Sequence, residues 1–361
     1  MKFLGKVLAY PLLAVNILTA LLLIFSCYGS LAAPIGRWPF ASLSGLAFPF
    51  LYIFNLLFLI LWLMTWKKGA IVPVVTILIC IVPTLNCFPL HFLKAGKVQK
   101  PYITVVTYNT EGFGIVNNKD WTINNPVLKY TLALDADIIF LQEATHVLTD
   151  NASQEKEIKS VFPYVGLPDG LNGEACLSKY PIILNQAIHF ENTRNACQYL
   201  RILVDKDTLA VYNCHFQSNQ LNKTDISEYQ NFIMHPTDST HYKTSKKVLK
   251  RLLESTAQRA VQARMIADRA RSETARYVIV CGDFNDTPLS YSHRQFDRFM
   301  NDTYAMSGWG AGITYHEHRL YYRIDHIFCG RNMTPLHTFV DRVQKGSDHY
   351  PVISRIRLES K

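Results

Sequence analysis

The sequence predicts an α/β fold in which two packed β-sheets are flanked by helices as a four-layer sandwich, preceded by three transmembrane helices. Two observations lead to this prediction. Residues 1–100 contain no Asp or Glu and hold three long apolar stretches. Residues 101–361 contain many short β-branched segments between Gly, Pro and Asn, with a few helical patterns among them, which is typical of packed sheets with helices outside.

The apolar stretches lie at residues 7–28, 44–66 and 70–92, and each is close to the ~20 residues that a helix needs to cross a bilayer core. A cleavable signal peptide is the alternative for the first stretch, because Lys2 and Lys6 precede it. Its apolar region is too long for a signal peptide. We therefore expect a multi-pass protein of the cell membrane that contacts the lipid bilayer through these helices.

The predicted division of the chain is a membrane domain at residues 1–93, a linker at 94–101 and a second domain at 102–361. Eight of the 37 Lys and Arg residues lie before residue 101, which leaves 29 against 28 Asp and Glu. The second domain is therefore nearly neutral, and its charge does not indicate a nucleic-acid surface. Lysines on one side of the predicted helices outnumber Arg37 on the other, which favours an extracytoplasmic second domain, whereas the lysines of the linker favour the opposite orientation.

Each element of the second domain follows from a local pattern. The helix expected at 124–134 begins with Asn125, a capping residue, followed by Pro126, which suits a first helical turn. The segment 244–272 is amphipathic, with Lys and Arg on the polar side that a solvated helix presents. Apolar and β-branched runs between turn residues indicate the strands. The remaining predicted elements are helices at 153–161 and 290–300 and strands at 102–108, 137–141, 174–178, 182–190, 198–204, 208–214, 277–281, 322–329 and 351–358.

Five of the eight cysteines follow the apolar part of the chain. Cys214, Cys281 and Cys329 lie in apolar strand-like runs, so we expect them to be small buried hydrophobic residues. No CxxC pair suggests zinc or redox chemistry. A disulfide between Cys176 and Cys197 stays open.

The stretch from Tyr277 to Asp286 combines a buried strand with a polar end. Gly282 ends the strand, and Asp283 and Asn285 follow on one side of the loop, where they could hold a phosphate oxygen, a water or a hard cation. An ordinary Asx turn would explain these two residues if they stood alone. Polar residues also end other predicted strands, at Asn109, Glu143, His215, Asp325 with His326, and Asp348 with His349.

Carboxylates, amides and histidines at neighbouring strand ends are the groups that hydrolysis of a phosphate ester needs. The reaction requires a divalent cation to neutralise charge on the phosphoryl group, an aligned water with a base, and an acid for the leaving oxygen. Oxygen donors outnumber nitrogen donors here, and the sequence holds no thiolate cluster. The expected cofactor is therefore Mg²⁺ or Mn²⁺.

Six motifs occur in a fixed order along residues 102–358: TYNTEGF, IIFLQEAT, YNCHFQSN, VCGDFNDTP, RIDHIF and GSDHYP. This ordered set resembles the endonuclease/exonuclease/phosphatase superfamily, which includes deoxyribonuclease I and the neutral sphingomyelinases. The resemblance identifies the second domain as a catalytic domain of that superfamily. A single motif such as GDFN would be weak evidence, and the order of all six makes the resemblance specific.

The resemblance implies a role for each polar strand end. Glu143 would be the principal metal ligand, with Asn109 near the metal and Asp348 completing the metal or histidine environment. Glu111 could be a second acidic group near the metal, although an exposed loop carboxylate is the simpler expectation. The implied catalytic residues are Asp283, which would orient or deprotonate the attacking water, Asn285, which would hold a phosphate oxygen, Asp325, which would pair with His349, and His215 as general acid.

Gln217, Arg194 and Asn195 are candidate substrate contacts. His326 is expected to point away from the site. The remaining histidines considered are expected to be structural or exposed, namely His189, His241, His316, His318 and His337.

The expected activity is hydrolysis of a phosphodiester or phosphomonoester by in-line attack of water, with a phospholipid headgroup as one substrate. The predicted membrane helices, the near-neutral second domain and the CHFQ segment at residues 214–217, which resembles the HLQ of bacterial sphingomyelinases, favour that substrate. An envelope nuclease acting on DNA or RNA is the first alternative, and a catalytically inactive binding module is the second. The sequence indicates no obligate protein partner.

Overall fold

The structure is a computed structural model that describes residues 2–32, 34, 39–91, 98–114, 122–144, 148, 152–170, 173–219, 240–317 and 321–359, without the side chains of residues 2–8, 152–153 and 240–245. Arg37, residues 94–97 of the predicted linker and His318 lie outside the described residues, and so does the side chain of His241.

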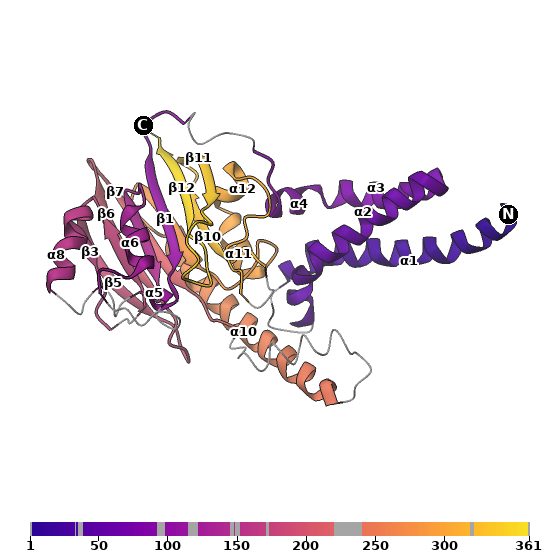
Figure 1. Ribbon diagram of the computed structural model, residues 1–361, viewed down its shortest axis with the longest axis horizontal. Coiled ribbons are helices and arrows are strands. Elements are labelled where there is room, and N and C mark those ends of the chain that lie inside the picture. The colour runs from indigo at the N-terminus through magenta and orange to yellow at the C-terminus, as the bar shows by residue number, and fades with distance from the viewer. Residues whose placement is uncertain are drawn as a thin grey trace.

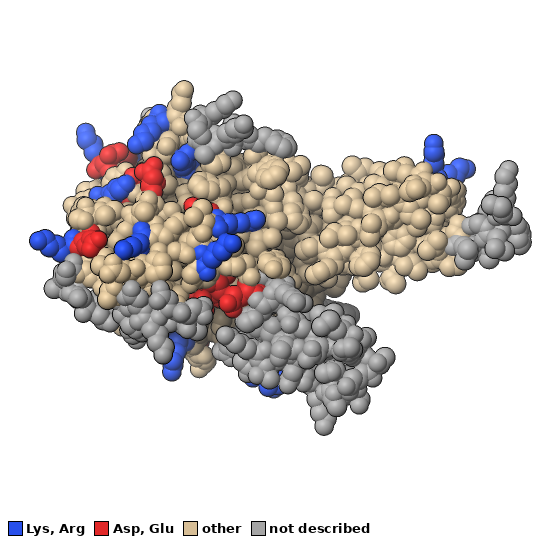
Figure 2. Space-filling view, viewed as in Figure 1, with Lys and Arg blue, Asp and Glu red and all other residues tan. Residues whose placement is uncertain are grey.

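The first part of the chain is a group of helices that extends away from the rest of the molecule (Figure 1). Two helical stretches, Ala9–Leu31 and Pro39–Thr65, are long and apolar enough to cross a membrane. Most of the visible surface of these helices carries no charged side chain, and lysines or arginines appear at the end far from the sheets (Figure 2). The helices are α1 (Lys2–Tyr28), α2 (Phe48–Thr65), α3 (Ile71–Ile79) and α4 (Ile81–Cys87), with short 3-10 helices η1 (Gly29–Leu31), η2 (Pro39–Ala47) and η3 (Lys67–Ala70).

The prediction of three spanning helices needs correction at the third stretch. The chain bends by 61° between α3 and α4, so a third span exists only if this bent pair is counted as one. Pro83 explains the break, because it lacks the N–H that would bond the carbonyl of Ile79 in a continuous helix. The hydroxyl of Tyr28 in α1 donates to that carbonyl instead, at 2.7 Å.

The second part contains two six-stranded sheets, as the sequence predicts. In the first sheet the strand order is β11-β12-β1-β2-β4-β3, and in the second it is β5-β6-β7-β8-β10-β9. The strands of the first sheet are β1 (Ile103–Asn109), β2 (Ile138–Gln142), β3 (Tyr164–Gly166), β4 (Ala175–Ser178), β11 (Met333–Val340) and β12 (Val352–Leu358). Those of the second are β5 (Ile182–His189), β6 (Ala196–Val204), β7 (Asp207–His215), β8 (Tyr277–Asp283), β9 (Met300–Asp302) and β10 (Asp325–Gly330).

Three apolar clusters build the four layers. One lies between the sheets and joins side chains of both, including Phe140 and Ile279. A second covers the outer face of the first sheet with α6 (Pro126–Ala133) and α8 (Ala152–Val161), and a third covers the second sheet with α10 (Thr240–Arg271) and α11 (Tyr291–Asp297). The predicted helices are therefore present, and they lie outside the sheets. Two short helices, α5 (Glu111–Gly114) and α12 (Thr303–Ser307), complete the described part of the fold.

The pairing of the strands brings their polar ends to one edge of the sandwich. β1 pairs in parallel with β2, and β7 pairs in parallel with β8, so the carboxyl ends of each pair meet. In the second pair His215 lies opposite Asp283. β10 runs antiparallel to β8, which places its first residue, Asp325, opposite Asp283 as well.

Three buried amide side chains join the two sheets behind this edge. Gln142 of β2 donates from Nε2 to Oδ1 of Asn213 in β7 at 2.6 Å. Asn213 donates from Nδ2 to the carbonyl of Leu141 at 3.0 Å and to Oε1 of Gln198 at 3.1 Å. This amide bridge fixes how one sheet lies on the other, because any sliding would leave buried polar atoms unpaired.

All eight cysteines are free. Cys214, Cys281 and Cys329 are fully buried in strands, which confirms their expected apolar role. The disulfide left open between Cys176 and Cys197 is not formed, because Cys176 lies between the sheets whereas Cys197 lies on the outer face of the second sheet. The Sγ of Cys214 lies 3.4 Å from that of Cys197.

Candidate active site

Asp283 is the centre of the polar edge. It ends β8 and is 1% exposed. Its Oδ2 accepts a hydrogen bond from Nδ2 of Asn109 at 3.1 Å, and the same oxygen lies 3.7 Å from Nε2 of His215 and 3.8 Å from Nε2 of His349. The structure therefore brings together residues that are up to 240 positions apart in the sequence.

His349 is oriented by Asp325. Nδ1 of His349 lies 2.8 Å from Oδ2 of Asp325, and both side chains are buried, so Nε2 faces Asp283. Burial alone would lower the pKa of His349, but the carboxylates of Asp325 and Asp283 and the hydrogen bond that His349 donates to Asp325 hold it well above its usual value. The pairing that the resemblance implied is present in the structure, together with a charge environment that favours the imidazolium.

Burial also raises the pKa of Asp283, and the negative charge of Asp325 adds to this effect. Positive charge on His349 and His215 opposes it. A carboxylate with a raised pKa accepts a proton more readily, which suits a group placed to take a proton from water.

Glu143 lies on the open side of the cluster. Its side chain is 44% exposed, and its Oε1 accepts a hydrogen bond from Nδ2 of Asn109 at 3.1 Å. Asn109 therefore bridges Glu143 of one sheet to Asp283 of the other, and His215 Nε2 lies 3.7 Å from both carboxylates. Glu143 adopts φ = 54°, a left-handed conformation that costs energy for a residue with a side chain and that persists only where the surroundings hold it.

Asp348 and Glu111 extend this acidic side. The amide N of Asp348 donates to Oε2 of Glu111 at 3.2 Å. Burial, together with the charge of nearby carboxylates, raises the pKa of Glu111 to about 7 and that of Asp348 to about 6. Glu111 is therefore half-buried beside Asp348, and the expectation of an exposed loop carboxylate is wrong. The cause is local, because Gly112 and the buried Phe113 have left-handed φ values and turn the chain inward.

Asn285 lies between the cluster and the neighbouring loop. Its backbone N donates to Oδ1 of Asp283 at 2.8 Å, and its Nδ2 donates to the carbonyl of Phe216 at 3.0 Å. Asn195 also donates to that carbonyl, at 3.0 Å. Asn285 adopts φ = 51°, a left-handed conformation that Asn takes up more readily than most residues with a side chain.

The other candidate substrate contacts are Gln217 and Arg194. Gln217 is 1% exposed, its backbone N donates to Gln262, and its carbonyl accepts from Arg259. These contacts stabilise the loop after β7. Arg194 is exposed. A role for either residue in binding substrate stays a prediction.

One buried acid near the site escaped prediction. Glu174 precedes β4, is 3% exposed, and lies close enough to His215 for the two charges to interact. Burial raises the pKa of Glu174, and His215 partly offsets this rise. The sequence gives little signal for it, because a single Glu before an apolar strand is common at a sheet edge. The other histidines considered are His189, which is exposed, His316, which stacks on Tyr350, and His337, which stacks on Phe339.

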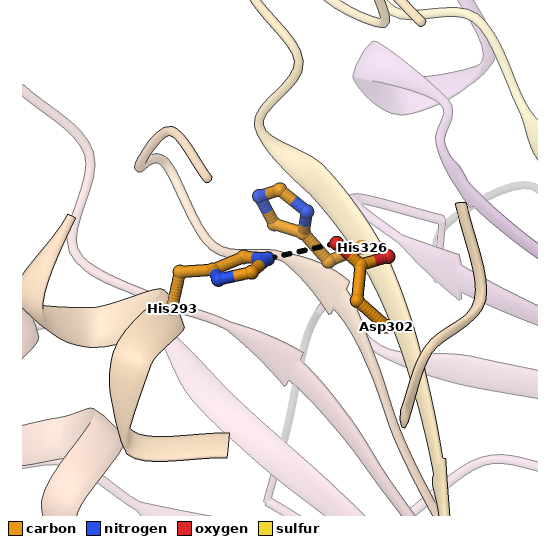
Figure 3. A group of neighbouring side chains, drawn as sticks. All are labelled: His293, Asp302 and His326. Atoms are coloured by element: carbon orange, nitrogen blue, oxygen red, sulfur yellow. Dashed lines mark hydrogen bonds and ion pairs between the residues drawn. The ribbon is translucent and has the colours of Figure 1, made fainter. Parts of the chain in front are cut away.

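A second buried polar group lies beyond β8. His293 Nε2 bonds to Oδ2 of Asp302 at 3.0 Å, and His326 lies beside them, bonded through Nε2 to the carbonyl of Asp286 at 2.9 Å (Figure 3). His326 thus points away from Asp283, as predicted. Arg323, with Nη2 at 3.9 Å from Oδ2 of Asp302, supplies the positive charge that this carboxylate needs. The group is a buried ion pair with histidine partners, and we assign it no metal.

A family model decides the relationship of this chain to known proteins. The model described as the endonuclease/exonuclease/phosphatase family matches residues 106–349. The chain belongs to this family. A second model, described as a domain of unknown function, matches residues 6–87. No curated protein matches the chain.

Solved structures of family members share the fold. Truncated TDP2 from Caenorhabditis elegans has a TM-score of 0.51 at 15% identity, over 71% of this chain and 97% of that chain. TDP2 from D. rerio, solved with a single-strand DNA product, has a TM-score of 0.50 at 16% identity, over 72% of this chain and 100% of that chain. An endonuclease/exonuclease/phosphatase from Beutenbergia cavernae has a TM-score of 0.49 at 18% identity, over 72% of each chain. At these identities the likeness establishes the fold alone.

Endonucleases, exonucleases and phosphatases all hydrolyse phosphate esters, so this family member is a hydrolase of that class. The family chemistry usually depends on a divalent metal, and the donor set fits one. Glu143, Asp283 and Asp348 supply carboxylate oxygens at one edge. Burial raises the pKa of Asp348, and the negative charges of Glu143 and Asp283 add to this rise. A hard divalent cation would offset that repulsion.

Proposed function

We propose that the chain is a membrane-anchored phosphoesterase in which Asp283 activates water, and Asp325, His349 and His215 stabilise the phosphoryl group and the leaving oxygen. The observation that carries this proposal is the convergence on Oδ2 of Asp283. That oxygen is within 4 Å of an amide donor and two imidazoles, one at the end of β7 and one in the segment before β12.

The attacking water would bond to Asp283. A proton on this water passes to Oδ2 as the water oxygen forms its bond to phosphorus, and the carboxyl group later returns the proton to solvent. Burial supports this role because it raises the pKa of Asp283. Asn285, held at φ = 51° beside it, would donate from its amide to a phosphoryl oxygen when substrate displaces its bond to Phe216.

His349 would bear positive charge beside the phosphoryl oxygens, since Asp325 holds its pKa high. His215 would deliver a proton to the leaving oxygen. Its ring is partly exposed, with a side chain at 12%, so it can reach a substrate and recover its proton from solvent. Two histidines with different exposure thus fit two roles, one electrostatic and one in proton transfer.

Glu143, with Asp348 and Asn109 beside it, would hold the metal. The proposed ion is Mg²⁺ or Mn²⁺, because each of these three side chains offers a carboxylate or amide oxygen as ligand. When bound, such an ion neutralises charge on the phosphoryl oxygens. Asn109 would orient Glu143 toward Asp283 through its two hydrogen bonds.

We propose the bilayer as the setting of this site. Residues 1–93 would form the membrane domain, 94–101 a linker and 102–361 the catalytic domain. Lys67 and Lys68 lie in η3, which joins α2 to α3. Figure 2 shows Lys or Arg side chains at the end of the helices far from the sheets. By the rule that positive loops stay in the cytoplasm, this arrangement supports an extracytoplasmic catalytic domain. A phospholipid headgroup is the proposed substrate, because a bilayer would lie on the same side of the catalytic domain as the helices.

A nuclease in the cell envelope is the second candidate. It is favoured by the fold shared with D. rerio TDP2, whose structure holds a single-strand DNA product. Opposing it, charges of both signs are interspersed on the visible face of the sandwich (Figure 2).

The experiment uses the full chain purified in detergent. Hydrolysis of bis-p-nitrophenyl phosphate is measured with Mg²⁺, with Mn²⁺ and with excess chelator, in the wild type, in Asp283→Ala and in Glu143→Ala. We expect activity only in the wild type with metal. Activity that survives either substitution would remove the assigned mechanism, and no activity under any condition would support a binding module. A panel of duplex DNA, RNA, sphingomyelin and phosphoinositide then separates the lipid and nuclease proposals.

A further inference from the structure

The loop that follows Asn285 reaches into the N-terminal helices. Leu289, four residues after Asn285, is 4% exposed and belongs to an apolar cluster. The other buried members of this cluster all come from α1, α2 and the bend after α3, namely Leu23, Cys27, Phe48 and Cys80. We call this set the Leu289 cluster.

Packing around Leu289 leaves little free space. A Cβ added at Gly45, in η2, would lie 3.2 Å from Cβ of Leu289 and 3.2 Å from its carbonyl oxygen. Gly45 is buried, and a methyl group there would force one of these segments to shift. η2 therefore lies close to both the side chain and the backbone of Leu289 in the loop after Asn285.

Arg323 makes a second contact with the helices. It is 4% exposed, its Nη2 donates to the carbonyl of Asn86 in α4, and its guanidinium lies 4.5 Å from the ring centre of Tyr304 in α12. Figure 1 shows α4 ending beside α12. Nearby, the amide N of Gly310 donates to the carbonyl of Pro89 at 2.8 Å. The bend between α3 and α4 thus places the end of α4 on the catalytic domain.

Both contacts lie next to catalytic side chains. Arg323 precedes Asp325 by two residues, and between them the carbonyl of Ile324 accepts a hydrogen bond from the amide N of Phe284 at 2.9 Å. Phe284 in turn separates Asp283 from Asn285. The end of β8 and the start of β10, which carry the site, are therefore hydrogen-bonded to each other. Residues that contact the helices lie next to both.

We propose that Leu289 and Arg323 are positioning residues, through which the N-terminal helices hold Asn285 and Asp325 in the geometry needed for hydrolysis. Asn285 adopts a left-handed conformation in the loop that follows β8. Leu289 anchors the loop that carries it, and Arg323 anchors the entry to β10. The helices are then part of the catalytic framework as well as an anchor. This inference rests on the proposed hydrolysis.

The test compares variants of the full chain in detergent. Leu289→Ala and Arg323→Gln weaken the two contacts, Leu289→Met and Arg323→Lys conserve them in part, and Met64→Ala is the matched control, because Met64 of α2 is apolar and 81% exposed. We expect kcat to fall about 10- to 100-fold in the first two variants, since a displacement of ~1 Å at a reacting group has an effect of this size. KM is expected to change by less than about threefold, because the metal side at Glu143 belongs to the other sheet. The Met and Lys variants should regain most of the lost kcat, because they conserve the two contacts in part.

Hydrogen exchange without substrate gives a readout that does not depend on activity. Exchange at residues 284–290 should accelerate in Leu289→Ala and stay unchanged in Met64→Ala, while protection in β1 and β2 is retained. If the wild type hydrolyses no phosphoester, the proposed function fails and this exchange measurement still decides whether the helices hold the loop. Wild-type kcat together with wild-type exchange in Leu289→Ala and Arg323→Gln overturns the proposal. The proposal is also overturned if Leu289→Ala and Leu289→Met both lose protection evenly over the two sheets, because that result indicates general destabilisation.

Discussion

Asp325→Asn tests the electrostatic part of the site. The substitution keeps the shape of the side chain and removes the negative charge 2.8 Å from Nδ1 of His349. A hydrogen bond to a charged group contributes about 1.5–3 kcal/mol, so at 1.4 kcal/mol per factor of ten we expect kcat/KM to fall roughly 10- to 150-fold. Asp268→Asn is the control, because this carboxylate is 64% exposed on α10 and pairs only with Arg271 among the described residues.

The same variant predicts a shift in pH dependence. The pKa of His349 is raised in the folded protein, so the stability that its charge contributes is present at low pH and lost as pH rises through that pKa. Removing Asp325 lowers this pKa, and the fall of activity on the alkaline side should move to lower pH. The assay is a pH profile of bis-p-nitrophenyl phosphate hydrolysis at saturating metal. An unchanged alkaline limb with an unchanged rate would refute the view that Asp325 acts through the charge of His349.

Three further predictions concern other parts of the molecule. Glu143→Gln should weaken Mg²⁺ binding by 10-fold or more, measured by calorimetric titration, because one of few carboxylates on the open side is neutralised. Gly282→Ala should destabilise the protein by about 3 kcal/mol or more, seen as a lower melting temperature, because its Cβ would lie 1.9 Å from the carbonyl of Cys214 at φ = 127°. Asp302→Asn should cost about 3 kcal/mol at pH 7. Burial opposes the charge of Asp302, but Arg323 and His293 hold its pKa below the usual value. That stability is present above the unfolded pKa and lost as pH falls, so the difference from wild type in melting temperature should shrink in acid.

The strands that carry the site could be predicted because their sequences combine an apolar run, which indicates burial, with a polar residue at its end. β8 is an apolar run as far as Gly282, and its last residue is the polar Asp283. Parallel pairing then brings such ends to one edge, so the convergence of His215 with Asp283 follows from topology. β11 escaped prediction because Pro335 interrupts it, and the structure places it at the edge of its sheet, with a bulge there, where Pro is tolerated.

Residues whose role depends on tertiary burial could not be predicted. Glu111 becomes part of the acidic side only because a left-handed turn buries Phe113 beneath it. Arg323 and Asp302 read as ordinary surface charges, yet they are 4% and 3% exposed. The bend after α3 likewise depends on Tyr28, a residue of another helix, whose hydroxyl donates a hydrogen bond to the carbonyl that Pro83 leaves free. These features arise from partners distant in sequence, and a local pattern carries no information about them.

The amide bridge of Gln142, Asn213 and Gln198 has a consequence for redesign. Its side-chain hydrogen bonds join β2, β6 and β7 in the interior, behind the catalytic edge. Rim segments could therefore be exchanged between relatives to recruit different phosphoesters, while the three amides keep the two halves of the catalytic apparatus aligned. A library that randomises the rim and leaves these three positions alone should retain a much larger share of active clones than one that varies them as well.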